Sequence, residues 1–294
     1  MNKLIKQAFT LIELLVVIAI IGILSGLIVV SMGGMTTKAT IAKAQVFSNS
    51  LRNSLMLNLV SEWKFDENTG TTIADSWNGE NTGTLTGATH LPTWKTGNNC
   101  ISGSCIQFDG IDDYIAIGNS NNLKFTKGYT AEAWVNLSSL SGERSIITKP
   151  ASYTFEVSGG MLIMAFTTNE AWHFTQSGNS ILSTNTWYHV VGTYDSSINA
   201  VKFYINGDLN KTDTTSSTGA IVTNNNTVQL GYYNGTFPDI FNGTMDQIRV
   251  YNAAISNSKI KEQYYTGLNN LLAGGGINEE QYYSRINSLA INNK

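Results

Sequence analysis

Charged side chains are scarce in this sequence. Asp, Glu, Lys and Arg make up 13% of its 294 residues, and the formal net charge is −3. Domains that bind nucleic acid carry clusters of excess Lys and Arg, so we predict no nucleic-acid partner. The polar surface must come from Asn, Ser, Thr and Gly instead, and their short side chains favour strands, turns and loops over exposed helices.

Motifs of common catalytic sites are also missing. The chain has no Gly-x-Ser-x-Gly segment, no phosphate-binding loop and no zinc-binding helix motif. Its three histidines are scattered along the sequence: His90, His173 and His189. The acidic pairs Asp66-Glu67 and Asp112-Asp113 are adjacent residues, which point to opposite faces of a strand and do not supply the facing carboxylates of a glycosidase. We therefore predict that the chain is not an enzyme.

One apolar run near the N-terminus is free of charge. Residues 14–32 are long enough to cross a bilayer as a helix, because about 20 residues at 1.5 Å each span roughly 30 Å. Lys3 and Lys6 precede the run, so the positive-inside rule predicts a cytoplasmic start and an exported remainder. Glu13 lies where the run begins, although a carboxylate there is unfavourable. An ordinary signal anchor or a cleaved signal peptide gains nothing from that charge.

Residues 8–13, AFTLIE, and the apolar run after them resemble the cleavage and methylation segment of type IV prepilins and pseudopilins. The resemblance implies that a prepilin peptidase cuts between Ala8 and Phe9 and methylates the new amine of Phe9. It also implies that Glu13 pairs with the N-terminal amine of another pilin subunit, and a buried carboxylate is tolerated when a cation meets it. Ala8 stands where the family usually has Gly, and the family's helix-kinking Pro is absent.

The hydrophobic pattern divides the chain into four parts. Residues 1–8 are the leader, and residues 9–60 are expected to form one long transmembrane and stalk helix, with apolar residues at spacings of three and four. From residue 61 the period changes to two, so residues 61–267 predict a mainly β, antiparallel two-sheet sandwich. Asn206-Gly207 predicts a hairpin turn within it. Residues 268–294 predict a short helical hairpin or a loose helical tail around residues 274–276.

An ordered set of motifs within the sandwich resembles the LamG-like jellyroll, a concanavalin A-like lectin fold. The set comprises WKFD at 63–66, FDG at 108–110, EAWV at 132–135, WYHVVGTY at 187–194 and GTMDQIRVYN at 243–252. The resemblance implies binding of sugars or protein surfaces, although a fold does not fix a function. Trp77, Trp172, Tyr232 and Tyr233 are candidate sugar platforms or packed aromatics, and the ligand-binding residues stay open.

The only two cysteines are Cys100 and Cys105. Outside the cytoplasm, two cysteines separated by a glycine-containing turn are expected to form a disulfide across a hairpin. The alternative is a metal-binding or redox pair, which the lack of a nearby His disfavours. The exported location implied by the N-terminus therefore favours the disulfide.

Residues 75–81, DSWNGEN, form a loop rich in the oxygen ligands that calcium prefers. LamG-like domains commonly hold calcium in a corresponding loop, completed by an Asp from a strand near the end of the domain, and Asp246 matches that position. The resemblance implies a structural Ca²⁺ held by Asp75, Asn78 and Asp246. The alternative is an Asx turn without a metal.

These features together predict a membrane-anchored, pilin-like surface protein. It would be a minor pilin or adhesin whose lectin-like head binds glycans or surface proteins, with the prepilin peptidase and other pilin subunits as partners. A structural pilin or pseudopilin of a filament or type II secretion-like system, with no ligand of its own, is the first alternative. An exported glycan-processing enzyme is the second. The predicted location is a single-pass protein of the cytoplasmic membrane with its head outside, or a subunit of a surface filament.

Overall fold

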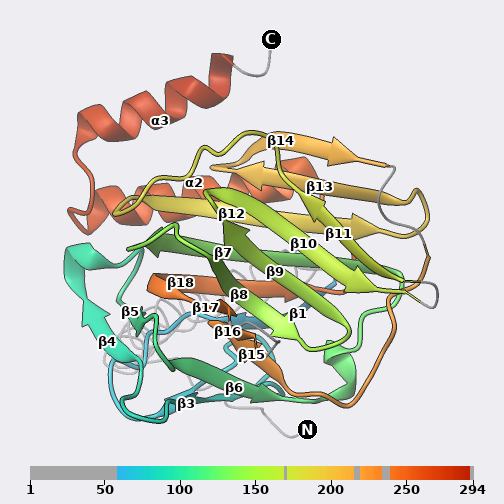
Figure 1. Cartoon of the computed structure of the whole chain (residues 1–294). Helices are drawn as coiled ribbons and strands as arrows, with labels where there is room; N and C mark the ends of the chain where they lie inside the picture. Colours follow the sequence, from blue (N-terminus) through green and yellow to red (C-terminus); the bar gives the residue numbers. More distant parts are fainter. Residues whose placement is uncertain (1–57, 169–170, 215–218, 234–238, 292–294) are drawn as a thin grey trace, which may run out of the picture. The chain divides into compact units, whose positions relative to one another are not determined.

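The computed structural model describes residues 58–168, 171–214, 219–233 and 239–291. The leader, the stalk helix and the predicted site residues Ala8, Phe9 and Glu13 lie outside these residues. Residues 58–294 form a compact unit by themselves, in which two antiparallel sheets pack face to face (Figure 1). The predicted sandwich is thus confirmed. Within the described residues, no helix has both the length and the apolar content needed to span a bilayer.

Sheet A has the strand order β14-β13-β12-β7-β18-β5-β4, and β1 also pairs with β18. Its strands are β1 (Leu59–Trp63), β4 (Thr93–Thr96), β5 (Ser104–Asp109), β7 (Gly128–Leu137), β12 (Trp187–Asp195), β13 (Ala200–Ile205), β14 (Asp208–Asp213) and β18 (Asn242–Tyr251). Its central strands β7, β12 and β18 are buried along most of their length. Both faces of the sheet are therefore covered there.

Sheet B has the strand order β11-β10-β9-β8-β15-β6-β3-β2. Its strands are β2 (Thr72–Ile73), β3 (Gly83–Thr86), β6 (Tyr114–Gly118), β8 (Glu143–Lys149), β9 (Tyr153–Ser158), β10 (Met161–Thr167), β11 (Trp172–Gln176) and β15 (Val228–Leu230). A separate short pair joins β16 (Tyr232–Tyr233) to β17 (Asp239–Ile240), and the 3₁₀ turns η1 and η2 span Gly97–Asn99 and Asn121–Leu123.

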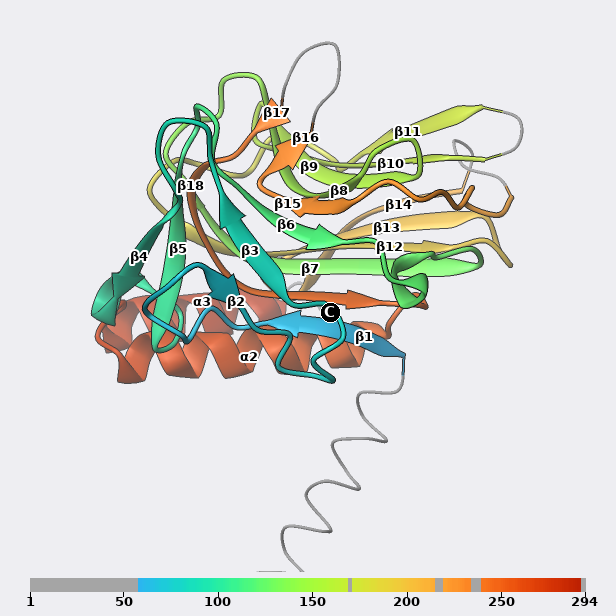
Figure 2. The same cartoon turned by 90° about the horizontal axis from the view of Figure 1, so that it is seen from below.

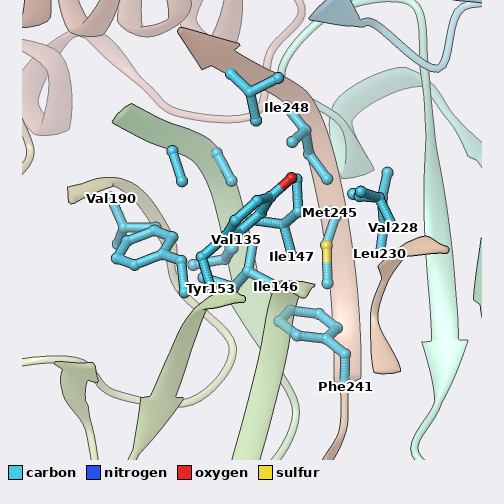
Figure 3. Packing of buried hydrophobic residues seen from close by; sticks show 14 of the residues in the cluster. Val135, Ile146, Ile147, Tyr153, Val190, Val228, Leu230, Phe241, Met245 and Ile248 are labelled. Carbon is cyan, nitrogen blue, oxygen red and sulfur yellow. The ribbon is translucent and has the colours of Figure 1, made fainter. Parts of the chain in front are cut away.

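The hydrophobic core lies between the two sheets. Figure 3 shows Val135, Val190 and Met245 of sheet A facing Tyr153 and Leu230 of sheet B, and all five are fully buried. Burying an aliphatic side chain of this size stabilises the fold by about 1.5–3 kcal/mol. The alternation of inward and outward residues along each strand produces this core.

The predicted hairpin turn joins β13 to β14. Asn206 and Gly207 have φ angles of +52° and +81°, which is the left-handed pair that a two-residue type I′ turn requires. Asn and Gly adopt that conformation with the least strain. The turn signal in the sequence is therefore confirmed.

The first strand begins where the stalk helix was expected to continue. Leu59 and Val60, which we assigned to the helix of residues 9–60, belong to β1, and Leu59 pairs with Tyr251 of β18. Asn58 has a φ angle of +77°, a conformation that an α-helix does not contain. The tertiary contact with β18 thus overrides the helical spacing of Leu59.

Two helices follow the sandwich, α2 (Asn257–Ala273) and α3 (Glu279–Ile291). Figure 2 shows α2 running along sheet A on the side away from sheet B. Ser256 caps α2 by accepting a hydrogen bond from the Lys259 N–H. The sequence predicts the start of the helical tail at residue 268, but α2 begins well before it. Ile260 and Tyr264 form an apolar stripe that is buried against sheet A.

The chain from α2 to α3 forms a docked helical hairpin rather than a loose tail. Ile277, Tyr282 and Ile286 pack against the apolar cluster that also contains Leu271 of α2. The Tyr282 hydroxyl donates a hydrogen bond to Asn269 Oδ1 at 2.7 Å. The docked hairpin places α3 beside the outer face of sheet A.

Candidate functional site

A cavity of about 540 Å³ lies between the outer face of sheet A, the turn η1 and helix α3. Six of its lining residues carry amides: Asn98, Asn99, Gln107, Asn136, Asn185 and Gln281. Ser138, Thr186 and Thr244 add hydroxyl groups. Amides and hydroxyls both donate and accept hydrogen bonds, so this cavity is suited to a ligand that presents many hydroxyl groups.

The register of four neighbouring strands builds the floor of the cavity. Trp187 of β12 lies opposite Asn136 of β7, and Asn136 lies opposite Thr244 of β18. Thr244 in turn lies opposite Gln107 of β5. Residues opposite each other on adjacent strands point to the same face, so these four side chains form one row across the sheet.

The walls of the cavity are positively charged. Lys95 of β4 and Arg285 of α3 line it, and its described lining residues include no Asp or Glu. Arg285 Nη1 donates a hydrogen bond to the backbone oxygen of Trp187 at 3.4 Å, which holds α3 at the start of β12. The cavity therefore favours neutral or negatively charged ligands.

Charged residues also meet under α2, but in a closed site. Glu132 is fully buried and accepts hydrogen bonds from Arg249 Nη1 at 2.8 Å and the Tyr251 hydroxyl at 3.3 Å. His189 Nε2 lies 3.0 Å from the same carboxylate, and Arg249 Nε donates to Glu62 at 2.8 Å. Burial raises the pKa of Glu132, but the charge and hydrogen bonds of Arg249 and His189 together outweigh burial and hold that pKa below its usual value. The buried His189 thus belongs to an internal ion-pair network.

The predicted calcium loop has its carboxylate occupied by backbone amides. Asp75 accepts hydrogen bonds from three N–H groups, those of Glu62, Trp77 and Asn81, at 3.0–3.3 Å. Asn78 Oδ1 accepts one from the Glu80 N–H at 2.9 Å. A hydrogen bond from the amide N–H two residues further on to an Asp or Asn side chain defines an Asx turn. Asp75 and Asn78 each form such a turn, which is the alternative to a metal site that the sequence leaves open.

The third predicted ligand, Asp246, lies on β18 and is fully buried. Its Oδ2 accepts hydrogen bonds from the N–H groups of Ile101 and Ser102 at 2.8 and 3.2 Å, and these partners differ from those of Asp75. Asp246 Oδ1 has no hydrogen-bond partner among the described residues, and burial raises the pKa of Asp246 well above its usual value. A shared calcium ion for Asp75, Asn78 and Asp246 stays a prediction.

The predicted disulfide between Cys100 and Cys105 is present, with the two Cα atoms 5.5 Å apart. The disulfide joins Cys100, in the connection between β4 and β5, to Cys105 in β5. Both cysteines pack in the apolar cluster with Trp134 and Leu271, so the disulfide fixes a segment that contacts α2.

We expect the Cys100→Ser head to lose about 2 kcal/mol of stability. The disulfide closes a small loop and so lowers the conformational entropy of the unfolded chain, and the variant lacks that effect. Thermal melting should show a midpoint lower by roughly 4–8 °C. The oxidised wild-type head should contain no free thiol before reduction. Free thiols in protein recovered from the cell surface would contradict the bridge.

The candidate aromatic residues lie in different environments. Trp172 is 43% exposed on β11, the edge strand of sheet B, and the neighbouring outward residue Phe174 is 47% exposed. Tyr232 instead stacks on Tyr114 with ring centroids 5.2 Å apart. Trp172 and Phe174 thus offer an aromatic surface, whereas Tyr232 is engaged in packing.

A cluster of carboxyl groups that the sequence analysis did not single out forms where β8, β9 and β17 meet. One oxygen each of Glu143, Glu156 and Asp239 lies within 4.8 Å of the others. Burial, together with the nearby Asp239 and Glu143, raises the pKa of Glu156 to about 8. Burial and Glu143 raise the pKa of Asp239 to about 7. Pairing of β8 with β9 brings Glu143 and Glu156 together, and the contact of β17 with β8 adds Asp239, which is distant in sequence.

This cluster should make the head less stable as the pH rises. Folded Glu156 keeps a proton that the unfolded chain releases above about pH 4.5. The contribution of Glu156 to the free energy of unfolding is therefore full below pH 4.5 and is lost as the pH rises through about 8. We expect Glu156→Gln to reduce the slope of unfolding free energy against pH by up to about 1.4 kcal/mol per pH unit. Urea unfolding between pH 5 and 8 measures this, and an unchanged slope would contradict it.

Two family descriptions match the chain. Residues 109–261 match the concanavalin A-like lectin/glucanases superfamily, and residues 5–29 match the prokaryotic N-terminal methylation motif. No curated protein is significantly similar to the chain. The first match spans the strands that carry most of the cavity floor.

Several solved structures share the fold. The binding domain of Paraclostridial Mosquitocidal Protein 1 is similar at 16% identity and a TM-score of 0.58, with 73% of this chain and 53% of that chain covered. The receptor binding domain of botulinum neurotoxin mosaic serotype C/D has 16% identity and a TM-score of 0.56, with 72% and 51% covered. This chain therefore spans about half the length of those two proteins.

Domain 4 of AbnA, an extracellular arabinanase from Geobacillus stearothermophilus, is similar over nearly its whole length. Its structure in complex with arabinotriose has 22% identity and a TM-score of 0.55, with 70% of this chain and 97% of that chain covered. At these identities the likeness shows the fold alone. By its matched residues, this chain belongs to the concanavalin A-like lectin/glucanases superfamily and carries the prokaryotic N-terminal methylation motif of type IV prepilin-like proteins.

Proposed function

We propose that the chain is a membrane-anchored, pilin-like adhesin whose head binds glycans in the cavity between sheet A and α3. The observation that carries this proposal is the row of Trp187, Asn136, Thr244 and Gln107 on the cavity floor. A row of amide, hydroxyl and indole groups matches the hydroxyl-rich and partly apolar surface of a sugar.

The ligand class follows from the charge of the cavity. Lys95 and Arg285 are its only charged side chains among the described lining residues. Carboxylate groups form strong, charge-assisted hydrogen bonds with guanidinium and ammonium groups. We therefore expect a preference for acidic glycans, such as those ending in a sugar carboxylate, over neutral ones, and binding that weakens as salt is added.

The proposed role is binding without catalysis. A glycosidase needs two carboxylates that flank the scissile bond, and the described lining of this cavity supplies none. The N-terminal segment provides the other half of the function: processing by a prepilin peptidase, anchoring in the cytoplasmic membrane and contact with other pilin subunits. The head would then be displayed outside the cell, on the membrane or in a filament.

Glycan-array binding of the head, residues 58–294, tests the proposal. Gln107→Ala and Lys95→Gln should each weaken binding about tenfold, which corresponds to about 1.4 kcal/mol. Gln229→Ala is the matched control, because Gln229 is a half-buried amide on the opposite sheet, and it should bind as the wild type does. Near-UV circular dichroism checks that each variant is folded.

Other outcomes of these binding experiments would assign a different binding site or a different function to the head. Glycan binding that survives both cavity variants but is lost in Trp172→Ala would place the ligand on the edge strand β11. If the head binds neither glycans nor surface proteins, the structural pilin or pseudopilin is favoured, in which the head is a spacer. Cleavage of an arrayed glycan would show a processing enzyme.

A further inference from the structure

Three aspartates converge in the chain that crosses from sheet A to sheet B. Asp109 ends β5, and Asp112 and Asp113 immediately precede β6. One carboxylate oxygen from each residue lies within 4.8 Å of the other two. Like charges at this separation repel each other, so the arrangement needs a compensating partner.

Hydrogen bonds fix the orientation of each carboxylate through one oxygen only. Asp113 Oδ2 accepts from the Asp109 N–H at 2.8 Å, and Asp109 Oδ1 accepts from the Ile111 N–H at 2.7 Å. Asp112 Oδ2 accepts from the N–H and the hydroxyl of Thr89 at 2.9 and 2.8 Å. The other oxygen of each carboxylate is thus available for a ligand.

Two of these second oxygens are buried without a partner. Asp112 Oδ1 and Asp113 Oδ1 make no hydrogen bond to any described residue, and Asp113 is only 2% exposed. Among the described residues, no Lys or Arg forms an ion pair with the three aspartates. A buried carboxylate oxygen left without hydrogen bond or cation is costly.

The backbone adds a further oxygen at this place. A Cβ built on Gly87 would clash with the His90 carbonyl oxygen and would lie 3.3 Å from Asp112 Oδ1. Both oxygens therefore border Gly87, where only a residue without a side chain fits. The turn of residues 87–90 thus brings a neutral carbonyl to the same glycine that Asp112 Oδ1 borders.

We propose that Asp109, Asp112 and Asp113 hold a hard divalent cation of the calcium class, with the His90 carbonyl as an additional ligand. Calcium takes six to eight oxygen ligands from carboxylates, backbone carbonyls and water in flexible geometry. Three carboxylates and a carbonyl supply the protein's part of such a shell, and water supplies the rest. This site shares no residue with the predicted set of Asp75, Asn78 and Asp246.

Titration of the full-length chain, in detergent and freed of metal, with calcium chloride tests the proposal. The wild type should bind calcium in isothermal titration calorimetry and should melt several degrees higher with calcium than with chelator. Asp112→Asn should bind at least tenfold more weakly. In chelator it should melt at or above the wild-type temperature, because the substitution removes like-charge repulsion and keeps the contacts with Thr89.

Matched variants distinguish this site from a cation bound elsewhere in the head. Asp109→Asn, at an exposed residue, should weaken calcium binding as Asp112→Asn does. Glu262→Gln should keep the full calcium response, and Asp246→Asn should keep the calcium binding that Asp112→Asn and Asp109→Asn lose. Loss of all calcium binding in a folded Asp246→Asn variant would overturn the proposal, since it would assign the ion to the other set. Identical melting in calcium and chelator, or calcium binding retained in Asp112→Asn, would overturn it as well.

Discussion

Glu132→Ala is expected to destabilise the head by about 3–5 kcal/mol, because it removes one partner of a buried ion pair. Arg249 would lose its 2.8 Å contact with Glu132 and keep Glu62 as its only acidic partner among the described residues. The Tyr251 hydroxyl and His189 Nε2 would also lose their acceptor in a site closed to water. Urea unfolding of the wild-type and variant heads measures the difference.

Glu262→Ala is the matched control for this prediction. Glu262 pairs with Lys259 at 3.2 Å on the surface of α2, and its side chain is 52% exposed. Exposed pairs contribute about 0–1 kcal/mol, so this variant should unfold close to the wild type. Equal losses in the two variants would show that the network under α2 contributes no more than a surface pair does.

Glu13→Ala is expected to abolish or strongly reduce incorporation into filaments, although residue 13 lies outside the described residues. Removing a carboxylate from the edge of an apolar run leaves membrane insertion intact or improves it. The variant lacks the carboxylate that pairs with the N-terminal amine of a neighbouring subunit, however. In the proposed role, filament assembly depends on that ion pair. Shearing of surface filaments followed by immunoblotting separates assembled from membrane-bound protein.

Glu13→Gln separates the effect of the lost charge from the effect of the lost side-chain volume. It keeps the length and hydrogen-bonding capacity of the side chain while removing its charge, so it should assemble as poorly as Glu13→Ala. Normal assembly of both variants would mean that Glu13 is incidental to this chain. Loss of the protein from the membrane fraction would point to failed insertion instead.

The sandwich could be predicted because its signals are local or ordered along the chain. The Asn206-Gly207 turn depends on two residues with positive φ, and the sequence identifies them directly. The boundaries of the sandwich depend on tertiary contacts instead. Leu59 fits a helical stripe but pairs with Tyr251 in β1, and α2 begins at Asn257 because Ile260 and Tyr264 pack on sheet A.

The candidate site could not be predicted, for a related reason. The cavity floor combines Trp187, Asn136, Thr244 and Gln107 from four strands whose order in the sheet differs from their order in the sequence. Its wall depends on the docking of α3, which the sequence left open. By contrast, the disulfide involves two residues close in sequence, so spacing and compartment were sufficient to predict it.

Mass spectrometry of the mature N-terminus tests the central claim that this lectin-fold head is carried by a pilin-like subunit. The account predicts that protein recovered from the membrane or from surface filaments begins at Phe9 with an N-methylated amine, and that residues 1–8 are absent. The peptide should shift to the unprocessed form in cells that lack the prepilin peptidase. Mature protein that retains residues 1–8, or that is cleaved after the apolar run, would contradict the account.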